Sequence, residues 1–324
     1  MEKLSPAVLE AFGLQSRGIK KEKGYYLCSI SKESEGLVKV HSTSETPEAI
    51  CLQHSIKEHI AAGFPHTDRH RLTRAGEPYI IVGRETYIAT ATPPPQPETD
   101  LENEAHVLEI FRALARLHIA SKIMPQKIPI SPPLPETYTR QLSDLVQGGK
   151  QARRGPRMSD FDVLLIKHAP RATEIIQEAI ERLEATNYSL LYTNAVSQGS
   201  LCHNALKEEN IPVSQGTPYI VNFTQATTDL QLNDLAALIR RYAQRSSKAI
   251  PITKLVDIYD SIHPLPHQAA DILYAQLIFP WAFMKLVTQY YSKKRNWTPN
   301  GLINRMETVL TEREDYETYI HTLI

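Results

Sequence analysis

The sequence is poor in cysteine, in glycine and in excess charge of either sign, and each shortage excludes a class of protein. Its three cysteines, Cys28, Cys51 and Cys202, are far apart and odd in number, which fits reduced thiols inside a cell rather than a disulfide framework. Lysine and arginine total 36, as do aspartate and glutamate, and this balance argues against a nucleic-acid-binding protein. The 13 glycines leave few positions where a backbone could wrap closely around phosphates.

Long apolar runs are also missing. The longest apolar-rich stretch, residues 272–287, is interrupted by Gln276, Pro280 and Lys285, so we expect no membrane span. The first ten residues contain neither an apolar core nor a small-residue cleavage site, so we expect no signal peptide. With 324 residues, of which 42% are hydrophobic, the chain is long enough for about two domains.

The first part of the chain has the pattern of a small α/β domain. Thr46 can cap a helix that begins at Pro47, a position that needs no N–H donor. Residues 72–74 and 79–82 are expected to form a hairpin around the turn 75–78. The other short apolar runs that predict strands are 25–30, 36–40 and 87–91.

A proline-rich segment at residues 93–97 predicts a stiff, extended connector. Beyond it the apolar residues follow helical spacing, with a kink expected at Pro170. The stretches with this spacing are 107–117, 161–183, 235–242, 251–262, 267–291 and 302–324. We therefore expect an N-terminal α/β lobe (1–92), a connector (93–104) and a helical C-terminal lobe (105–324).

One region among the helices carries three short motifs in a fixed order. The first is Cys202-His203-Asn204-Ala205-Leu206-Lys207-Glu208-Glu209-Asn210-Ile211, the second is Val221-Asn222-Phe223-Thr224, and the third is Asn233-Asp234-Leu235-Ala236. In order and spacing they resemble the catalytic centre of the aminoglycoside-phosphotransferase-like branch of the protein-kinase fold. The pattern of that family is His-Gly-Asp-Leu-His-x-x-Asn-Ile, then Ile-Asp-Phe-Asp, then Asp-Leu-Ala.

The N-terminal part fits the same resemblance. Lys39 stands where the ATP-contacting lysine of the third strand would be. Gln53 falls about where the glutamate of helix C belongs, although Glu58 on the same helix could also serve. Residues 113–118, Ala-Leu-Ala-Arg-Leu-His, resemble the helix that opens the second lobe. The resemblance implies an α+β, two-lobed kinase-like fold with a small α/β N-lobe and a large, mostly helical C-lobe.

The sequence resembles still more closely the CotS-related family of spore-coat proteins, a kinase-like group of endospore-forming bacteria. The segments that carry this likeness are residues 72–79, 279–283 and 289–297. The resemblance implies synthesis in the cytoplasm, deposition in the spore coat and other spore-coat proteins as partners. Tyr290, Tyr291 and Trp297, beside Lys293, Lys294 and Arg295, are the candidate partner surface. The sequence does not predict an oligomeric state.

The departures from the kinase pattern remove the groups that phosphoryl transfer needs. In the family, one aspartate accepts the proton of the attacking hydroxyl, and a second aspartate with an asparagine holds Mg²⁺. Here Ala205 stands at the base position and Asn222 at the main metal position, while Asn210 is kept. Since Mg²⁺ usually binds one or two carboxylates, two amides make a poor site. We therefore expect no catalytic residue, no metal and no cofactor.

Other positions also indicate that the kinase-like fold is retained while the groups for phosphoryl transfer are lost. If Gln53 is the true partner position, Lys39 has no charged partner there, and Gly36 is the only glycine between Tyr25 and Lys39. In the resembled family, the residue at Asp234 orients the loop that contains the histidine at His203. We expect Lys39, His203, Asn210 and Asp234 to line a remnant cleft. The prediction is a catalytically inactive kinase-fold protein with a structural or interaction role.

Two alternatives remain open at this stage. Glu208, Glu209 or Asp229 could supply a displaced base or metal ligand, which would make the protein an atypical small-molecule phosphotransferase. A cleft lined by Lys39 could instead bind a nucleotide or metabolite without a metal.

Overall fold

The computed structural model describes residues 4–15, 19–22, 24–29, 37–91, 99–124, 128–154, 158–246, 250–291 and 299–321. The chain forms two compact units, and neither is a continuous stretch of sequence. Unit 1 comprises residues 1–129, 198–228 and 261–263, and unit 2 comprises residues 130–197, 229–260 and 264–324. Residues 92–98, which include the prolines of the expected connector, lie outside the described residues. The division into lobes at that connector therefore stays a prediction.

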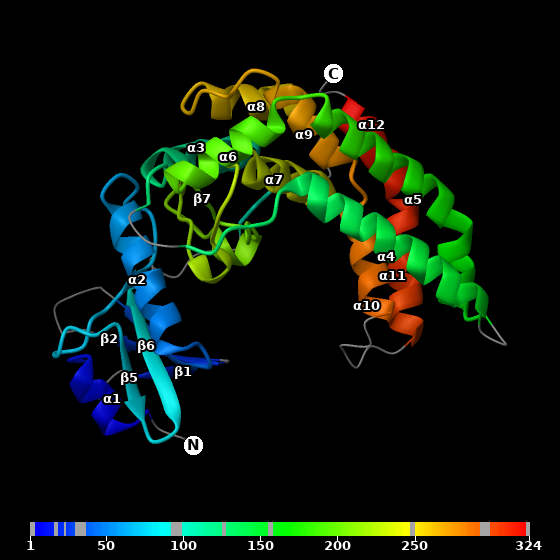
Figure 1. Cartoon of the computed structure of the whole chain (residues 1–324). Coiled ribbons are helices and arrows are strands. Elements are labelled where there is room, and N and C mark those ends of the chain that lie inside the picture. The colour runs from blue at the N-terminus through cyan, green and yellow to red at the C-terminus, as the bar shows by residue number, and fades with distance from the viewer. Residues whose placement is uncertain are drawn as a thin grey trace. The chain divides into compact units, whose positions relative to one another are not determined.

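Unit 1 contains a six-stranded antiparallel sheet (Figure 1). Its strands are β1 (Lys20–Glu22), β2 (Tyr25–Ser29), β3 (Leu37–Thr43), β4 (Arg69–His70), β5 (Tyr79–Val82) and β6 (Glu85–Ala91). The strand order is β1-β2-β3-β6-β4, and β5 pairs with the other part of β6. Strands were therefore predicted correctly at β2, β3, β5 and β6.

The predicted hairpin around residues 75–78 is wrong. The hairpin joins β5 to β6 across Gly83 and Arg84, with Val82 opposite Glu85, and Gly83 has a φ of +67°. The segment 72–74 forms no strand. Instead, Thr73 donates its N–H to Glu77 and accepts the N–H of Gly76, which folds this segment into a local turn.

The sheet separates an apolar face from a charged one. Side chains alternate along a strand, so Val38 and Val40 of β3 pack with Val8 and Phe12 of the helix α1 (Pro6–Ala11) and its C-terminal end. Lys39 and His41 of the same strand lie on the opposite face, where the pKa of His41 is lowered by burial and by the charges of Lys39 and Lys57. Strand periodicity thus places Lys39 away from the apolar core.

The helix α2 (Pro47–Ala61) begins as the sequence predicts. Thr46 accepts the N–H of Ala49 through its hydroxyl at 3.3 Å, and Pro47 occupies the first helical position. Its buried residues are Ile50, Gln53, Ile56, Lys57 and Ile60. A polar pair at i and i+4 therefore lies within the buried part of this helix, and it is Lys57, not Glu58, that is fully enclosed.

The remaining elements of unit 1 bring the kinase-like motifs together. They are α3 (Glu104–Ala120), β7 (Leu201–Cys202), η1 (Glu208–Asn210), β8 (Val213–Ser214), β9 (Thr217–Pro218), η2 (Phe223–Gln225) and β10 (Thr227–Thr228). Asn103 caps α3 by accepting the N–H groups of Ala105 and His106. Strand β7 pairs antiparallel with β10, Cys202 opposite Thr227. This pairing holds the histidine-containing loop beside the segment that contains Asn222.

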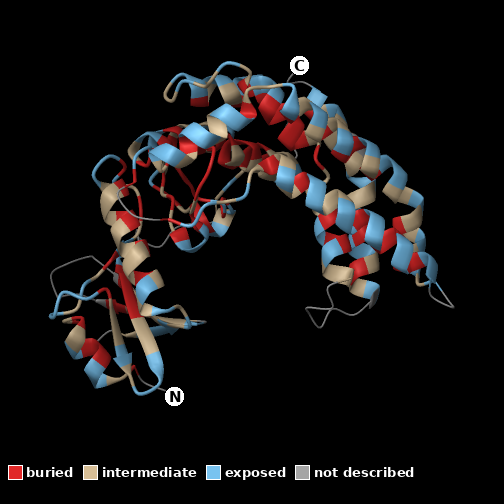
Figure 2. Cartoon of the chain, in the orientation of Figure 1, coloured by how far each residue is buried: buried red, intermediate tan, exposed pale blue. Residues whose placement is uncertain are grey.

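Unit 2 is helical. Its helices are α4 (Leu134–Arg154), α5 (Asp160–Glu184), α6 (Tyr188–Gln198), α7 (Leu232–Arg245), α8 (Ile252–Asp260), α9 (Ala269–Ile278), α10 (Trp281–Tyr291), α11 (Pro299–Thr311) and α12 (Arg313–Ile320). Figure 2 shows many buried residues on α9, of which seven of the ten are buried. Each of the two predicted helices 267–291 and 302–324 is in fact two helices.

Pro280 separates α9 from α10, because its ring cannot continue the hydrogen-bond ladder of a helix. Among the described residues, none of the helices is by itself long and apolar enough for a membrane span. The pair α9 and α10 passes that test together by length and composition, although it is bent by 44°.

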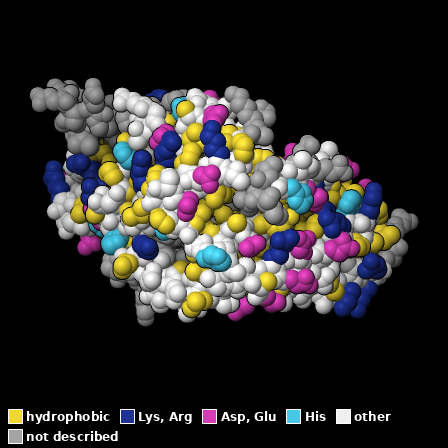
Figure 3. Space-filling model, turned by 90° about the horizontal axis from the view of Figure 1, so that it is seen from above, with side chains coloured by type: hydrophobic (Ala, Val, Ile, Leu, Met, Phe, Trp, Pro, Cys, Tyr) yellow, Lys and Arg dark blue, Asp and Glu magenta, His cyan; other side chains and the backbone are white. Residues whose placement is uncertain are grey.

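The aromatic residues expected to form a partner surface are instead partly used in packing between helices. Tyr290 stacks on Phe161 with 4.0 Å between ring centroids, and the Tyr291 hydroxyl donates to Asp162 at 2.8 Å. The rest of that patch, at residues 292–298, lies outside the described residues. The face drawn in Figure 3 carries basic and acidic side chains intermixed, consistent with the balanced composition.

Candidate functional site

Lys39 lies on β3 with its ammonium group 4.4 Å from the centroid of the Tyr25 ring. Burial lowers the pKa of Lys39, and the negative charge of Asp68 opposes that shift. Neither candidate on α2 is its partner. Gln53 donates from Nε2 to Glu45 at 2.8 Å, and Glu58 accepts a two-nitrogen contact from Arg69.

The buried ion pair of this region joins Lys57 of α2 to Asp68, just before β4. The distance from Nζ to Oδ2 is 2.6 Å, and the two side chains are 3% and 13% exposed. Burial alone would raise the pKa of Asp68, but the charge and hydrogen bond of Lys57 and the N–H of Asn222 hold that pKa below its ordinary value. Asp68 is therefore an ionised carboxylate fixed between α2 and the Asn222 segment.

The histidine-containing loop is held by its own hydrogen bonds. His203 is fully buried, its Nδ1 accepts the N–H of Ala205 at 3.2 Å, and its Nε2 contacts the carbonyl of Val221 at 2.9 Å. A ring whose Nδ1 accepts carries its proton on Nε2, so the hydrogen bonds are those of a neutral imidazole. The loop therefore keeps a defined shape although Ala205, at the base position, has no proton acceptor.

Asn210 and Asn222 hydrogen bond to each other. Nδ2 of Asn222 donates to Oδ1 of Asn210 at 3.1 Å, and Nδ2 of Asn210 donates to the carbonyl of Ala205 at 2.8 Å. Oδ1 of Asn222 accepts from the Thr224 hydroxyl at 2.8 Å. Asn222 has a φ of +69°, a conformation that asparagine adopts more readily than most residues. Both expected metal-ligand positions thus serve as links between two loops.

These groups do not fit a magnesium ion well. The amide oxygens of Asn210 and Asn222 each already accept a hydrogen bond. The carboxylate of Asp68 is shared between the Lys57 ammonium and the Asn222 N–H. A hard divalent cation needs oxygen ligands, usually with one or two carboxylates. Within the described part of the chain, no group of three or more histidine, cysteine, aspartate or glutamate residues could hold a metal.

The other carboxylates considered in the sequence lie elsewhere. Glu209 is exposed and lies 3.7 Å from Lys207, and Glu208 begins η1. Asp229 belongs to unit 2, where burial raises its pKa to about 6. Asp234, also in unit 2, is buried in the first turn of α7, and its contact with the His203 loop stays a prediction. Lys39, His203, Asn210 and Asn222 all belong to unit 1.

Sequence reasoning missed Lys57 and Asp68, which are the charged centre of this site. A signal for Lys57 was present, since it lies four residues after Gln53 and so on the same face of the helix. Asp68 had no comparable signal because a short loop carries it.

Three histidines surround this ion pair. Burial, with the positive charge of Lys57 next in size, lowers the pKa of His70 to about 3, and burial lowers that of His41 to about 4. The rings of His54 and His70 meet edge to face, 5.9 Å between centroids. Within the described structure, both ring nitrogens of His70 are buried without a hydrogen-bond partner. His41 and His70 are therefore neutral when the protein is folded at ordinary pH.

The sequence profile of the family described as “Spore coat putative kinase YutH” matches residues 6–323. The chain is also 22% identical over 189 residues to “Spore coat protein S” of Bacillus subtilis strain 168. That match covers 57% of this chain and 54% of the relative, so the chain spans about half the length of the curated relative it matches.

Among solved structures, an aminoglycoside phosphotransferase from Alicyclobacillus acidocaldarius has a TM-score of 0.84 at 18% identity, covering 100% of this chain and 96% of that one. A microcompartment-associated aminopropanol kinase has a TM-score of 0.61 at 14% identity, covering 98% and 97%. At these identities the likeness shows the fold alone, and it confirms the expected aminoglycoside-phosphotransferase-like α+β fold.

Proposed function

The chain belongs to the YutH family of spore-coat kinase-like proteins, and from that premise we propose that it is a catalytically inactive member with a structural or interaction role in the spore coat. The observation that carries the proposal is the hydrogen bond between the amides of Asn210 and Asn222. It ties together the two positions at which an active kinase would hold its metal ion.

Two further features support the same proposal. Ala205 offers no base to the attacking hydroxyl, and general-base assistance is typically worth about 10²–10⁴ in rate. The buried carboxylate of Asp68, which accepts the N–H of Asn222, is already paired with the ammonium group of Lys57. Because these groups hydrogen bond to one another, a metal ion would have to break existing contacts in order to bind.

A thermal-shift titration of the full chain with ATP, in the presence and absence of Mg²⁺, tests the inactivity. A ligand at 100 times its Kd stabilises the folded state by about 2.7 kcal/mol, which gives a readily measured shift. We expect no Mg²⁺-dependent shift. Asn222→Asp restores a carboxylate at the metal position and is expected to create such a shift, whereas Asn194→Asp on the exposed face of α6 is the matched control. A metal-dependent shift in the unaltered chain would overturn the proposal.

The ionised carboxylate of Asp68 favours one alternative, an atypical phosphotransferase with a relocated acidic group. It lies in unit 1 with Lys39, whose ammonium it influences, and it accepts the N–H of Asn222. On this alternative the unaltered chain shows Mg²⁺-dependent stabilisation by ATP, and Asp68→Asn removes it. If the Mg²⁺-dependent shift persists in Asp68→Asn but is lost in Glu208→Gln or Glu209→Gln, the relocated acidic group lies in the exposed loop instead.

Lys39 favours a second alternative, a nucleotide or metabolite site that uses no metal. Its ammonium is partly desolvated and lies over the ring of Tyr25, so an anion could replace lost water contacts. Stabilisation by ATP without Mg²⁺, lost in Lys39→Gln but kept when the exposed Lys20 is changed to Gln, would support it.

We also propose cytoplasmic synthesis followed by deposition in the spore coat, with other coat proteins as partners. Family membership supports this location, and so does the likeness to a spore coat protein. Fractionation of spores that carry a tagged chain tests it. We expect the tag in the coat extract, and recovery only in the spore interior would contradict the proposal.

A further inference from the structure

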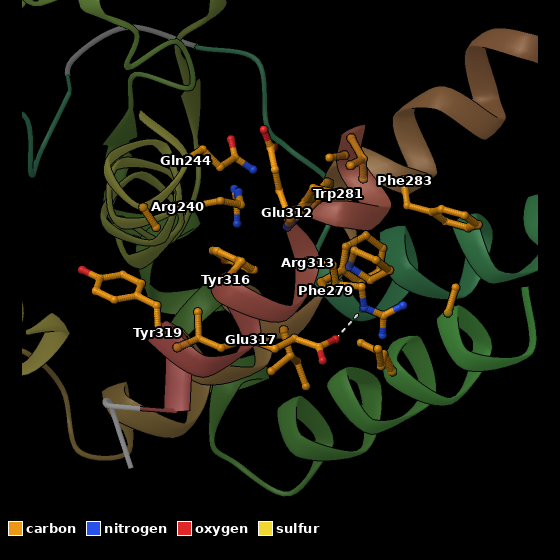
Figure 4. A pocket seen from close by; sticks show the side chains of 18 of the residues that line it. Arg240, Gln244, Phe279, Trp281, Phe283, Glu312, Arg313, Tyr316, Glu317 and Tyr319 are labelled. Carbon is orange, nitrogen blue, oxygen red and sulfur yellow. Dashed lines mark hydrogen bonds and ion pairs between the residues drawn. The ribbon is translucent and has the colours of Figure 1, made fainter. Parts of the chain in front are cut away.

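Unit 2 contains a cavity of about 550 Å³ whose lining residues include none of the candidate site residues. Its walls come from α5, α7, α9, α10, α11 and α12 and from the Phe279–Pro280 link (Figure 4). Cavities of roughly 300–1,000 Å³ are typical of small-molecule sites. Figure 4 shows Arg240 and Gln244 extending from α7 toward Glu312 and Tyr316. The space is therefore bordered on one side by a guanidinium group.

Most charges that line the cavity are compensated by a neighbour. Arg313 donates to Glu317 at 2.6 Å, Arg171 donates to Glu174 at 3.2 Å, and Glu178 accepts from Arg182 at 2.9 Å. Glu312 is exposed at the N-terminal end of α12. These pairs leave two charged lining groups, the guanidinium of Arg240 and the exposed carboxylate of Glu312, without an ion pair among the described residues.

Arg240 forms no ion pair with any carboxylate of the described residues. Its Nη1 donates to the carbonyl of Gln276 at 3.2 Å, and its guanidinium lies 5.4 Å from the centroid of the Trp281 ring. Burial lowers the pKa of Arg240, yet arginine keeps its proton in proteins. A charged group with five donors is thus partly desolvated without an anionic partner, which is costly unless an anion binds there.

The neighbourhood of Arg240 has more donors than acceptors. The carbonyl of Gln276 also accepts from Nε1 of Trp281 at 3.3 Å. Among the described atoms, Nε2 of Gln276 and the hydroxyl of Tyr138 are buried without a hydrogen-bond partner. Tyr138 stacks on Phe279 with 3.9 Å between centroids. The acceptor that Arg240 uses is thus a neutral carbonyl shared with Trp281, and no carboxylate of the described residues forms an ion pair with it.

Several of the other lining groups are aromatic. Phe279, Trp281, Phe283 and Tyr316 all contribute to the wall. Aromatic walls beside one arginine that forms no ion pair favour a ligand with a flat apolar body and a single negative end.

We propose that this cavity binds a small organic anion, whose oxyanion contacts Arg240 and whose flat apolar body lies against Trp281 and Tyr316. The shared chemistry is a carboxylate or phosphate on an aromatic or similarly flat group. The site is independent of the kinase-like motifs, so it stands whether or not the protein transfers phosphate.

Binding of three probes to the full chain, followed by saturation-transfer NMR and by tryptophan fluorescence, tests the proposal. The probes are 2-naphthoate, phenyl phosphate and the neutral 2-naphthamide. We expect at least one anion to bind, and 2-naphthamide to bind about 10-fold or more weakly, because charge-assisted hydrogen bonds are the strong ones. Preference between the two anions identifies the carboxylate or the phosphate as the natural end group.

Two variants and one matched control locate the binding. Arg240→Gln is expected to weaken anion binding about 10- to 100-fold. Arg171→Gln, which removes an exposed and paired arginine from the same lining, is expected to change it less than twofold. Should Arg240→Gln fail to fold, Ala243→Phe keeps the guanidinium but fills the space, and it is expected to abolish binding.

Each contrary result overturns the proposal. The proposal is wrong if neither anion binds the unaltered chain, or if 2-naphthamide binds as tightly as the anions. It is also wrong if Arg171→Gln weakens anion binding as much as Arg240→Gln does. The same holds if a folded Arg240→Gln or Ala243→Phe variant binds the anions as tightly as the unaltered chain.

Discussion

At the scale of single residues, the ion pair between Lys57 and Asp68 dominates the electrostatics of unit 1. Lys57 is almost fully buried on α2, and Asp68 also accepts the N–H of Asn222. The pair therefore links a helix, a strand edge and the second kinase-like motif. An ion pair of this kind contributes to stability mainly through the penalty for leaving either partner alone.

Lys57→Met is expected to lower the free energy of unfolding by about 3–5 kcal/mol, because Asp68 would remain buried without its partner. Urea unfolding followed by circular dichroism measures this change. The comparison variant is Arg69→Gln, which breaks the more exposed contact with Glu58 and should cost less than about 1 kcal/mol. Equal costs for the two variants would show that the buried pair has no special role.

The pH dependence of stability follows from His70. Its pKa falls from an ordinary 6.5 to about 3 on folding, because of burial and the charge of Lys57. The unfolded chain therefore binds more protons than the folded chain between those values, so stability is full above pH 6.5 and declines as the pH falls toward 3. His41 acts in the same direction down to about pH 4.

His70→Phe is accordingly expected to flatten the decline in stability between pH 6.5 and 4. Denaturant midpoints at several pH values measure it, and His267→Gln, at an exposed position, is the control. An unchanged slope in His70→Phe would contradict the assignment to this ring.

At the scale of elements, local rules predicted α2 well and the hairpin badly. Thr46 and Pro47 predicted the start of α2, and the structure confirms it. The segment 75–78 contains a glycine and a proline and predicts a hairpin turn, but Thr73 closes a local turn there and the hairpin turn lies eight residues later, at Gly83 and Arg84. Turn composition alone did not distinguish these two arrangements.

The helices α1, α4 and α6 had no predicted counterpart. For α4 the reason is visible in its sequence, since its mean hydropathy is low and its buried face includes Gly148 and Gly149. The other buried residues of that face, Leu134, Tyr138, Leu145 and Ala152, follow helical spacing.

The two glycines of α4 form a matched pair. A Cβ on Gly149 would meet only the end of Arg153 at 3.7 Å, whereas one on Gly148 would lie 2.9 Å from Cε2 of Tyr291, whose hydroxyl is bound to Asp162. Gly149→Ala should therefore stabilise the protein by up to about 1 kcal/mol through helix propensity. Gly148→Ala should be at least about 1 kcal/mol less stable than Gly149→Ala. Thermal unfolding of both variants measures the difference. Equal stabilities would mean that Tyr291 at the end of α10 moves aside without an energetic cost.

At the scale of the whole molecule, the order of the three kinase-like motifs predicted the fold, while the composition only excluded some classes of protein. The three motifs predicted an aminoglycoside-phosphotransferase-like fold, which the solved structures confirm. The residues that departed from the pattern, Ala205 and Asn222, were visible in the sequence, but the Asn210–Asn222 hydrogen bond depends on loops paired through β7 and β10. The cavity around Arg240 was not predictable, because four separate stretches of chain form it.

Unit 1 includes residues 198–228 as well as residues up to 129, which predicts how fragments behave. A fragment ending at Pro129 lacks the Asn222 N–H that Asp68 accepts, and it lacks β7 and β10. We expect it to show little protected backbone in hydrogen exchange, unlike the full chain. Adding residues 198–228 through a flexible linker should restore protection, and a well-protected fragment 1–129 would contradict the interleaved arrangement.

The same interleaving constrains the nascent chain. As ribosomes synthesise the protein, its first unit is not complete until residue 263 has left the exit tunnel, and by then the helices from α4 to α8 have already emerged. The charged face of the first sheet must therefore stay open to water and to chaperones while these helices are synthesised.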